Sequence, residues 1–284
     1  MRRWVVLFLA GTLISSVSAF SLSPDSTELR VMSFNIRYDN PHDGIFSWDQ
    51  RKELVFNVLQ LESPDIIGFQ EALVNQTKEL ADNLSSLAWY GVGRDDGNQK
   101  GEYAPIFYRK DCFALLDSGF FWLSETPEVP GSISWGAACT RIVTWVQLSE
   151  NSSKQILFIF NTHFDHVSED ARVHASELLL SKIRTITGDA DLILTGDFNC
   201  TPEDHAFQLL NTDLTATGPS VKDLDDACSF VGFPAKNSPG NIIDFIFFKG
   251  KPGISPGKYE IVDFHQGELY PSDHLPVVSD FYLW

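Results

Sequence analysis

Three strand-like hydrophobic runs in this chain end in reactive polar side chains, and this repeated pattern constrains the fold more than any other feature. The segments at their ends are Phe69-Gln70-Glu71, Asn161-Thr162-His163 and Gly196-Asp197-Phe198-Asn199, and a fourth segment near the C-terminus is Pro271-Ser272-Asp273-His274. Side chains at the ends of neighbouring buried strands meet at one edge of a sheet. The sequence therefore predicts a single polar site, whose carboxylates and imidazoles can hold a divalent metal ion and a water molecule.

The hydrophobic pattern along the chain alternates between strand-like and helix-like segments. Predicted helices begin near Asp49, at Val74, after a cap at Ser168 and after a cap at Thr201, where Pro202 would take the first helical position. Predicted strands are Leu29 to Ile36, Asp65 to Phe69, several antiparallel strands between Tyr103 and Leu148, Gln155 to Phe164, Asp191 to Thr195, Ile242 to Phe248, Tyr259 to Phe264 and Leu275 to Tyr282. This pattern predicts a four-layer α/β sandwich, in which two mostly antiparallel mixed sheets pack together and helices cover the outside.

The first residues have the composition of a secretory signal peptide. Arg2 and Arg3 precede an apolar run from Trp4 to Ile14, and Val17-Ser18-Ala19 offers a cleavage point. The run is too short to span a bilayer, so we expect residues 1–19 to be removed and the protein to be secreted, without stable membrane insertion. Residues 20–284 contain no linker and are predicted to form one domain, which we expect to be monomeric.

The net charge of −17 makes a long polyanionic partner unfavourable, and removal of Arg2 and Arg3 would make the charge more negative still. Metal ions bound at the site could reverse the sign of the charge locally, so nucleic acid is not excluded. An acidic extracellular surface would have the same composition without any such role.

Secretion would also permit disulfides and glycans. The four cysteines allow three pairings, and we favour Cys112 with Cys139 and Cys200 with Cys228 because they are neighbours in sequence. Asn75, Asn83 and Asn151 lie in glycosylation sequons, as does Asn199, where a glycan would block the predicted site.

Six motifs in the chain, taken in order, resemble the signature segments of the endonuclease/exonuclease/phosphatase superfamily. They are Ser33-Phe34-Asn35, Gln70-Glu71, Asn161-Thr162-His163, Gly196-Asp197-Phe198-Asn199, Ile243-Asp244-Phe245-Ile246 and Ser272-Asp273-His274. Each motif alone has a structural explanation, since Asn35 can bridge a turn, Glu71 can cap a helix and Asp197 can form an Asx-turn. Six in the right order, from about Leu29 to Trp284, are specific. The resemblance implies a metal-dependent phosphoester hydrolase.

The resemblance also assigns roles to the principal site residues. Glu71, with Asn35 and Asp273, would supply oxygen ligands to Mg²⁺ or Mn²⁺. Asp197, assisted by Asn199, would orient a water molecule and accept its proton for in-line attack on phosphorus.

Two imidazoles complete the expected site. His274 would donate to a phosphoryl oxygen while Asp244 orients its ring, and His163 would be oriented in the same way by Glu102. Tyr108 and Arg141 are candidates for touching the phosphate, although a core aromatic and a surface cation are equally good explanations. Trp48 and Arg51 are predicted to lock the start of the first helix structurally.

The sequence leaves the substrate open. We expect a secreted phosphodiesterase, with a nuclease acting on DNA or RNA as its commonest form. The alternatives are a phosphatase or phosphodiesterase for small organic phosphates or lipid headgroups, in the manner of a sphingomyelinase, and a non-catalytic extracellular binding module. Lysines and arginines are scattered along the chain, which favours a small or single phosphodiester over a long duplex. A module without catalysis would not need the complete set of acids and imidazoles.

Overall fold

The computed structural model describes residues 27–218, 228–233, 241–250 and 253–284. The predicted signal peptide, residues 1–19, lies outside the described residues. In the part that is described, no helix is both long enough and apolar enough to cross a membrane.

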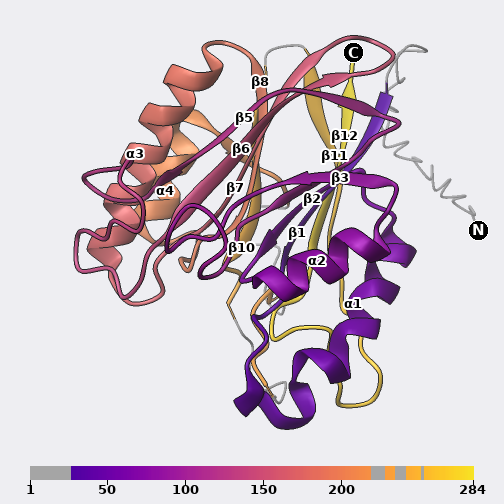
Figure 1. Ribbon diagram of the computed structural model, residues 1–284. Helices are drawn as coiled ribbons and strands as arrows, with labels where there is room; N and C mark the ends of the chain where they lie inside the picture. Colours follow the sequence, from indigo (N-terminus) through magenta and orange to yellow (C-terminus); the bar gives the residue numbers. More distant parts are fainter. Residues whose placement is uncertain (1–26, 219–227, 234–240, 251–252) are drawn as a thin grey trace, which may run out of the picture.

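Two six-stranded sheets form the centre of the molecule, with the spatial strand orders β11-β12-β1-β2-β4-β3 and β5-β6-β7-β8-β10-β9 (Figure 1). The strands are β1 (Thr27–Asn35), β2 (Ile66–Gln70), β3 (Leu87–Tyr90), β4 (Ile106–Arg109), β5 (Phe113–Trp122), β6 (Ile142–Glu150), β7 (Ile156–His163), β8 (Asp191–Asp197), β9 (Thr215–Ala216), β10 (Asp244–Lys249), β11 (Ile254–Ile261) and β12 (Val277–Leu283). The β1/β2 and β7/β8 pairs are parallel and the other neighbours are antiparallel. The prediction of two mostly antiparallel mixed sheets is therefore confirmed.

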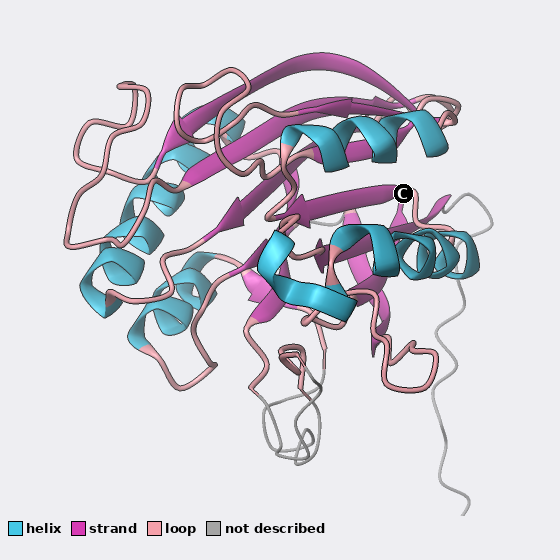
Figure 2. Ribbon diagram, turned by 60° about the horizontal axis from the view of Figure 1, so that its bottom comes forward, coloured by secondary structure: helices cyan, strands magenta, loops and turns pink. Residues whose placement is uncertain are grey.

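Helices cover the outer faces of both sheets, as Figure 2 shows with helices at the left and right of the strands. They are α1 (Trp48–Glu62), α2 (Val74–Asn83), α3 (Glu169–Thr187) and α4 (His205–Asp213), with a short 3₁₀ helix, η1 (Pro41–Phe46), before α1. The core has three apolar layers, one under α3 and α4, one between the sheets and one under α1 and α2. These layers confirm the predicted four-layer α/β sandwich.

Two details differ from the sequence prediction. Helix α4 begins after Asp204 rather than Thr201, because the carboxylate of Asp204 accepts from the backbone N–H of Thr201 at 2.7 Å and closes a separate turn first. The edge strand β3 was not predicted, since its four residues are partly exposed and too few to show a hydrophobic period. By contrast, the cap of α3 is confirmed, because Oγ of Ser168 accepts from the N–H of Ala171 at 3.1 Å.

Arg51 is the predicted structural lock, and the structure confirms it. The side chain is completely buried on α1. Its guanidinium donates to four backbone carbonyl groups, those of Phe46, Ile36, Arg37 and Pro271. Arg51 thus joins the end of β1 to the loop before β12, and both segments carry predicted site residues. Trp48 contributes to the same helix start, since its indole N–H donates to Glu79 at 2.9 Å.

A polar contact joins the two sheets directly beneath the predicted site. Gln70 donates to Oδ1 of Asn161 at 2.7 Å, and the amide of Asn161 donates to the carbonyl group of Phe69 at 2.6 Å. The sheets approach so closely here that a Cβ atom at Gly68 would lie 2.0 Å from Oγ1 of Thr195 and 2.6 Å from Oδ1 of Asn161. Only glycine fits between these side chains.

We therefore expect Gly68→Ala to lower the free energy of unfolding by about 1–3 kcal/mol, the usual cost of overpacking a dense core. Urea denaturation followed by tryptophan fluorescence measures this change. A midpoint equal to that of the wild type would show that the sheets can separate at this position without cost.

Candidate active site

The predicted site residues converge because the two parallel strand pairs end at the same edge of the sandwich. In β1 and β2, Asn35 is in register with Gln70, so Glu71 leaves the sheet beside Asn35. In β7 and β8, His163 is in register with Asp197. Contacts between β1 and β8 and between β2 and β7 bring the two pairs face to face. The pairing of the strands therefore places an amide (Asn35), two acids (Glu71 and Asp197) and an imidazole (His163) together.

The antiparallel strand β10 adds the next acid. Asp244 is the register partner of Asp197, and its Oδ2 lies 2.9 Å from Nδ1 of His274. The other nitrogen of His274, Nε2, lies 3.7 Å from Oδ2 of Asp197. Burial alone would lower the pKa of His274, but the charges of Asp244 and Asp197 raise it well above its ordinary value. This imidazole is therefore held as a cation and aimed at the centre of the site.

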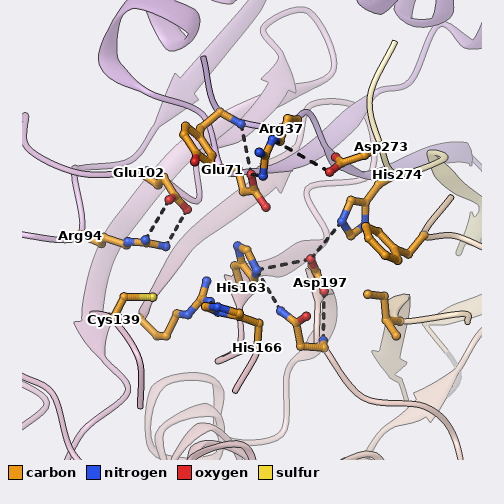
Figure 3. Close-up of a pocket in the computed structure, with 15 residues that line it drawn as sticks. Arg37, Glu71, Arg94, Glu102, Cys139, His163, His166, Asp197, Asp273 and His274 are labelled. Carbon is orange, nitrogen blue, oxygen red and sulfur yellow. Dashed lines mark hydrogen bonds and ion pairs between the residues drawn. The ribbon is translucent and has the colours of Figure 1, made fainter. Parts of the chain in front are cut away.

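Asp197 lies at the centre of this polar network, almost completely buried (Figure 3). Its carboxylate accepts from Nδ2 of Asn35 at 2.9 Å and from the backbone N–H of Asn199 at 3.0 Å. Burial and the neighbouring charge of Asp244 raise the pKa of Asp197 to about 7. A carboxylate with this pKa can exchange a proton with a water molecule near neutral pH.

His163 is held differently from His274. Its Nε2 lies 3.0 Å from Nδ2 of Asn199, which is a donor, so this ring nitrogen accepts. Burial, with the positive charges of Arg141 and Arg94, keeps the pKa of His163 well below its ordinary value. The ring is therefore neutral, and its Nδ1 has no hydrogen-bond partner among the residues described. That nitrogen is buried.

Glu71 and Asp273 supply the oxygen atoms that suit a hard divalent cation. Oε2 of Glu71 accepts from the backbone N–H of Tyr38 at 3.1 Å, and Arg37 approaches Glu71 and Asp273 to 3.9 Å and 4.0 Å. Burial and the charge of Glu71 raise the pKa of Asp273, so a further positive charge would be favourable between the two acids. The donor set thus fits a divalent metal. Ligand atoms of Glu71, His163 and Asp197 also lie within 4.8 Å of one another.

Asn35 is placed at the site, where its amide group makes hydrogen bonds to several partners. Oδ1 of Asn35 accepts from the backbone N–H of Arg37 at 3.0 Å, while Nδ2 donates to Glu71 at 3.0 Å and to Asp197 at 2.9 Å. Asn35 therefore bridges the two acids, because one amide group can donate to both. The direct metal-ligand role expected from the sequence stays a prediction, because Oδ1 accepts one hydrogen bond here and keeps a second lone pair.

Glu102 does not orient His163, and this prediction was wrong. Its two carboxylate oxygens are taken by a fork-like ion pair with Arg94, at 2.6 Å and 2.8 Å. A planar guanidinium binds both oxygens of a carboxylate, whereas an imidazole offers a single N–H, so Glu102 pairs with Arg94 and not with His163. Glu102 still lines the cavity, across from His274 in Figure 3.

The structure places the two weaker candidates for phosphate contact, Tyr108 and Arg141, in different surroundings. Tyr108 lies in the core between the sheets, 5% exposed, and does not line the cavity, so its role as a core aromatic holds. Alternation along β4 turns it inward. Arg141 does line the cavity, with Nη2 3.0 Å from Nδ1 of His166, while its Nε and Nη1 have no hydrogen-bond partner among the residues described.

The cavity has a volume of about 490 Å³. Its lining includes residues that the sequence did not assign to the site: Tyr38, Cys139, Phe230 and Ile243, beside Arg37, Arg94 and His166. Arg37 and His166 are marked as candidates by the sequence, because each lies two or three residues from a motif residue. Phe230 is not, since no strand pattern or motif marks its segment.

The predicted disulfides are not present. All four cysteines are free, and they lie in different parts of the molecule. Cys200 is buried in the core under α3 and α4, Cys112 packs against the core between the sheets, and Cys139 lines the cavity. Proximity in sequence was a poor guide, because a disulfide needs Cα atoms within about 7 Å.

The fold and the site together define a class, the hydrolases of phosphate esters that work with a divalent metal ion. Comparison with known proteins is more specific. A model of the endonuclease/exonuclease/phosphatase family matches residues 32–274. The chain belongs to this family.

Solved structures and a curated relative agree with this assignment. An endonuclease/exonuclease/phosphatase from Bacteroides vulgatus has a TM-score of 0.81 and 36% identity, covering 91% of this chain and 100% of that chain. A mannosyl-6-phosphatase from Bacteroides thetaiotaomicron has a TM-score of 0.81 and 31% identity, covering 89% of this chain and 99% of that chain. The CCR4-Not complex 3'-5'-exoribonuclease subunit Ccr4 of Mycosarcoma maydis is 22% identical over 366 residues, covering 99% of this chain and 54% of that protein. This chain thus spans about half the length of that relative.

Proposed function

We propose that this protein is a phosphatase that removes phosphate from small organic phosphates with the help of Mg²⁺ or Mn²⁺. The observation that carries the proposal is one cavity of about 490 Å³ in which the cations Arg37 and Arg141 lie beside the acids and imidazoles of the site. Enzymes that follow a nucleic-acid strand need cations along a groove, whereas a single phosphate needs them at one point. The net charge of the whole chain, −17, also disfavours a long polyanion as substrate.

The side chains at the site can carry the hydrolytic step. We assign Asp197, held by Asn35 and Asn199, to orient a water molecule and accept its proton as the oxygen attacks phosphorus. His274, held by Asp244, donates a hydrogen bond to a phosphoryl oxygen as negative charge accumulates there. His163 also lines the cavity, with its Nε2 3.4 Å from Oδ2 of Asp197.

Glu71 and Asp273 would hold the divalent metal ion, whose charge would stabilise the negative charge on the phosphoryl oxygens. Arg37 approaches both acids: its Nη1 lies 3.9 Å from Oε2 of Glu71, and its Nε lies 4.0 Å from Oδ2 of Asp273. We assign it to neutralise the acids and to limit how many cations the site attracts. The likeness to a mannosyl-6-phosphatase over 89% of this chain supports a phosphomonoester as substrate.

A nuclease remains the second candidate, because two observations favour it. One relative is an exoribonuclease, and Phe230 is partly exposed in the cavity with its ring 4.9 Å from that of His274. An exposed ring beside a phosphate site can stack on a nucleobase.

The proposal includes secretion and action as a monomer. The apolar run from Trp4 to Ile14 after Arg2 and Arg3 supports secretion.

We expect the purified protein with Mg²⁺ or Mn²⁺ to hydrolyse p-nitrophenyl phosphate with a higher kcat/KM than bis-(p-nitrophenyl) phosphate. EDTA should abolish the activity and added metal should restore it, because without a cation the carboxylates of Glu71 and Asp273 repel the negative phosphoryl oxygens. The assay measures released phosphate and p-nitrophenol. A single-stranded oligoribonucleotide and plasmid DNA complete the panel.

The opposite ranking would contradict the proposal. Rapid shortening of the oligoribonucleotide by a protein inert towards the monoester would establish the nuclease instead. Full activity in EDTA would reject the metal role.

A further inference from the structure

The ion pair between Arg94 and Glu102 forms a second polar surface in the cavity, apart from the residues that contact the phosphate in the proposed mechanism. Both side chains line the cavity, and they remain 13% and 17% exposed. Figure 3 shows them facing each other on the opposite side from His274. The charge of Arg94 lowers the pKa of His163, so the pair lies within electrostatic reach of the centre.

The backbone holds this pair rigidly. The N–H of Arg94 donates to the carbonyl group of Glu102 at 3.0 Å, and the carbonyl group of Arg94 accepts from the indole of Trp122 at 2.6 Å. At Gly93 a Cβ atom would lie 2.2 Å from the carbonyl oxygen of Lys100, so the two arms of the hairpin are in direct contact. Groups held this firmly bind a ligand without a further cost in entropy.

The pair also retains unused hydrogen-bonding capacity. The fork uses one N–H from each of Nη1 and Nη2 of Arg94 and one lone pair from each oxygen of Glu102. Each of these four atoms can make at least one more hydrogen bond. At the edge of the ion pair, an N–H donor of Arg94 therefore lies next to an acceptor oxygen of Glu102. This arrangement suits neighbouring hydroxyl groups, because each hydroxyl both donates and accepts a hydrogen bond.

A contribution to stability alone does not explain why the Arg94–Glu102 ion pair lies in the cavity. A partly exposed pair adds only about 0–1 kcal/mol to stability. Beside it, Arg141 is 4% exposed and lines the same cavity, with Nε 3.8 Å from Oδ2 of Asp165 and Nη1 without a hydrogen-bond partner among the residues described. The open fork of Arg94 and Glu102, with a second buried arginine beside it, makes this side of the cavity suited to a polar ligand.

We propose that Arg94 and Glu102 bind the hydroxyl groups of the alcohol that leaves with the ester oxygen, so that the preferred substrates are phosphorylated sugars or polyols. This inference rests on the proposed phosphatase function. Arg94 and Glu102 are specificity residues, because they touch the alcohol and not phosphorus. Apolar and aromatic leaving groups would leave the hydrogen-bonding groups of the pair unpaired when they displace water from it.

The test compares two substrates with similar leaving groups, mannose 6-phosphate and n-hexyl phosphate, of which only the sugar has hydroxyl groups beside the ester. In Glu102→Gln, kcat/KM for mannose 6-phosphate should fall about tenfold to a hundredfold more than kcat/KM for n-hexyl phosphate, since hydrogen bonds to a charged group are lost. Arg94→Lys should give the same selective loss, because lysine keeps the charge without the fork.

Asp213→Asn is the matched control. Asp213 is also paired with an arginine, Arg184, whose Nε and Nη2 both donate to its Oδ2, but on the exposed surface outside the cavity. We expect this variant to keep the wild-type values on both substrates. Equal losses on the two substrates in Glu102→Gln would overturn the inference and leave the phosphatase proposal standing. Failure of the wild type to hydrolyse p-nitrophenyl phosphate, n-hexyl phosphate and mannose 6-phosphate would instead reject the phosphatase proposal itself.

Discussion

Replacing Asp197 by asparagine should reduce kcat by about a hundredfold to ten-thousandfold, the usual contribution of a positioned base. Asparagine preserves the shape of the side chain but cannot accept a proton from water. The position is well suited to this test, because Asn35 and Asn199 fix the carboxylate from two sides. The measurement is steady-state hydrolysis of p-nitrophenyl phosphate at saturating metal, where the loss should lie in kcat.

The same variant should remain folded. Burial and the charge of Asp244 disfavour the ionised form of Asp197, which is why its pKa rises to about 7. A neutral side chain relieves this cost, so the free energy of unfolding at pH 8 should be equal to or higher than that of the wild type.

Asp191→Asn provides the control for Asp197→Asn. Asp191 lies at the other end of β8, where Oδ2 accepts from Gln155 at 2.9 Å, far along the strand from the site. This variant should keep its activity. If Asp197→Asn were as active as the wild type while folded, the base would have to be another group, and the assignment of Asp197 would be wrong.

The convergence of the site could be predicted because it depends only on strand ends. Buried strands are recognisable from their apolar runs, and the residue after such a run must lie at a sheet edge. Glu71, His163 and Asp197 were found in this way, and the parallel registers of β1 with β2 and β7 with β8 explain why they meet.

The residues whose roles were predicted wrongly or missed had alternative partners or orientations, and the sequence does not distinguish between these. Glu102 had two possible partners, His163 and Arg94, and only the three-dimensional hairpin from Gly93 to Tyr103 decides between them. Tyr108 could face either side of β4, because both faces of that strand are buried. Phe230 enters the cavity through an isolated bridge to His274, a contact between segments with no shared pattern.

Arg51 shows how the two halves of the site are held together, and its replacement should have the largest effect on stability. We expect Arg51→Met to lower the free energy of unfolding by about 3–5 kcal/mol, as expected when a buried hydrogen-bonded charge network is broken. The methionine would fill the space but leave four carbonyl groups without their donor. Guanidinium-induced unfolding, followed by fluorescence, measures the change.

Arg51→Lys separates charge from geometry. Lysine keeps the positive charge but cannot reach carbonyl groups on both segments in a fixed plane, so its stability should fall between those of Arg51→Met and the wild type. Two of the accepting carbonyls belong to Ile36 and Arg37, just after Asn35, and a third belongs to Pro271, just before Asp273. Loosening Arg51 should therefore also weaken Mn²⁺ binding at Glu71 and Asp273, measured by titration calorimetry under conditions where the variant is folded. A folded Arg51→Met with wild-type stability and Mn²⁺ affinity would show that the sheets, and not this side chain, hold the two segments together.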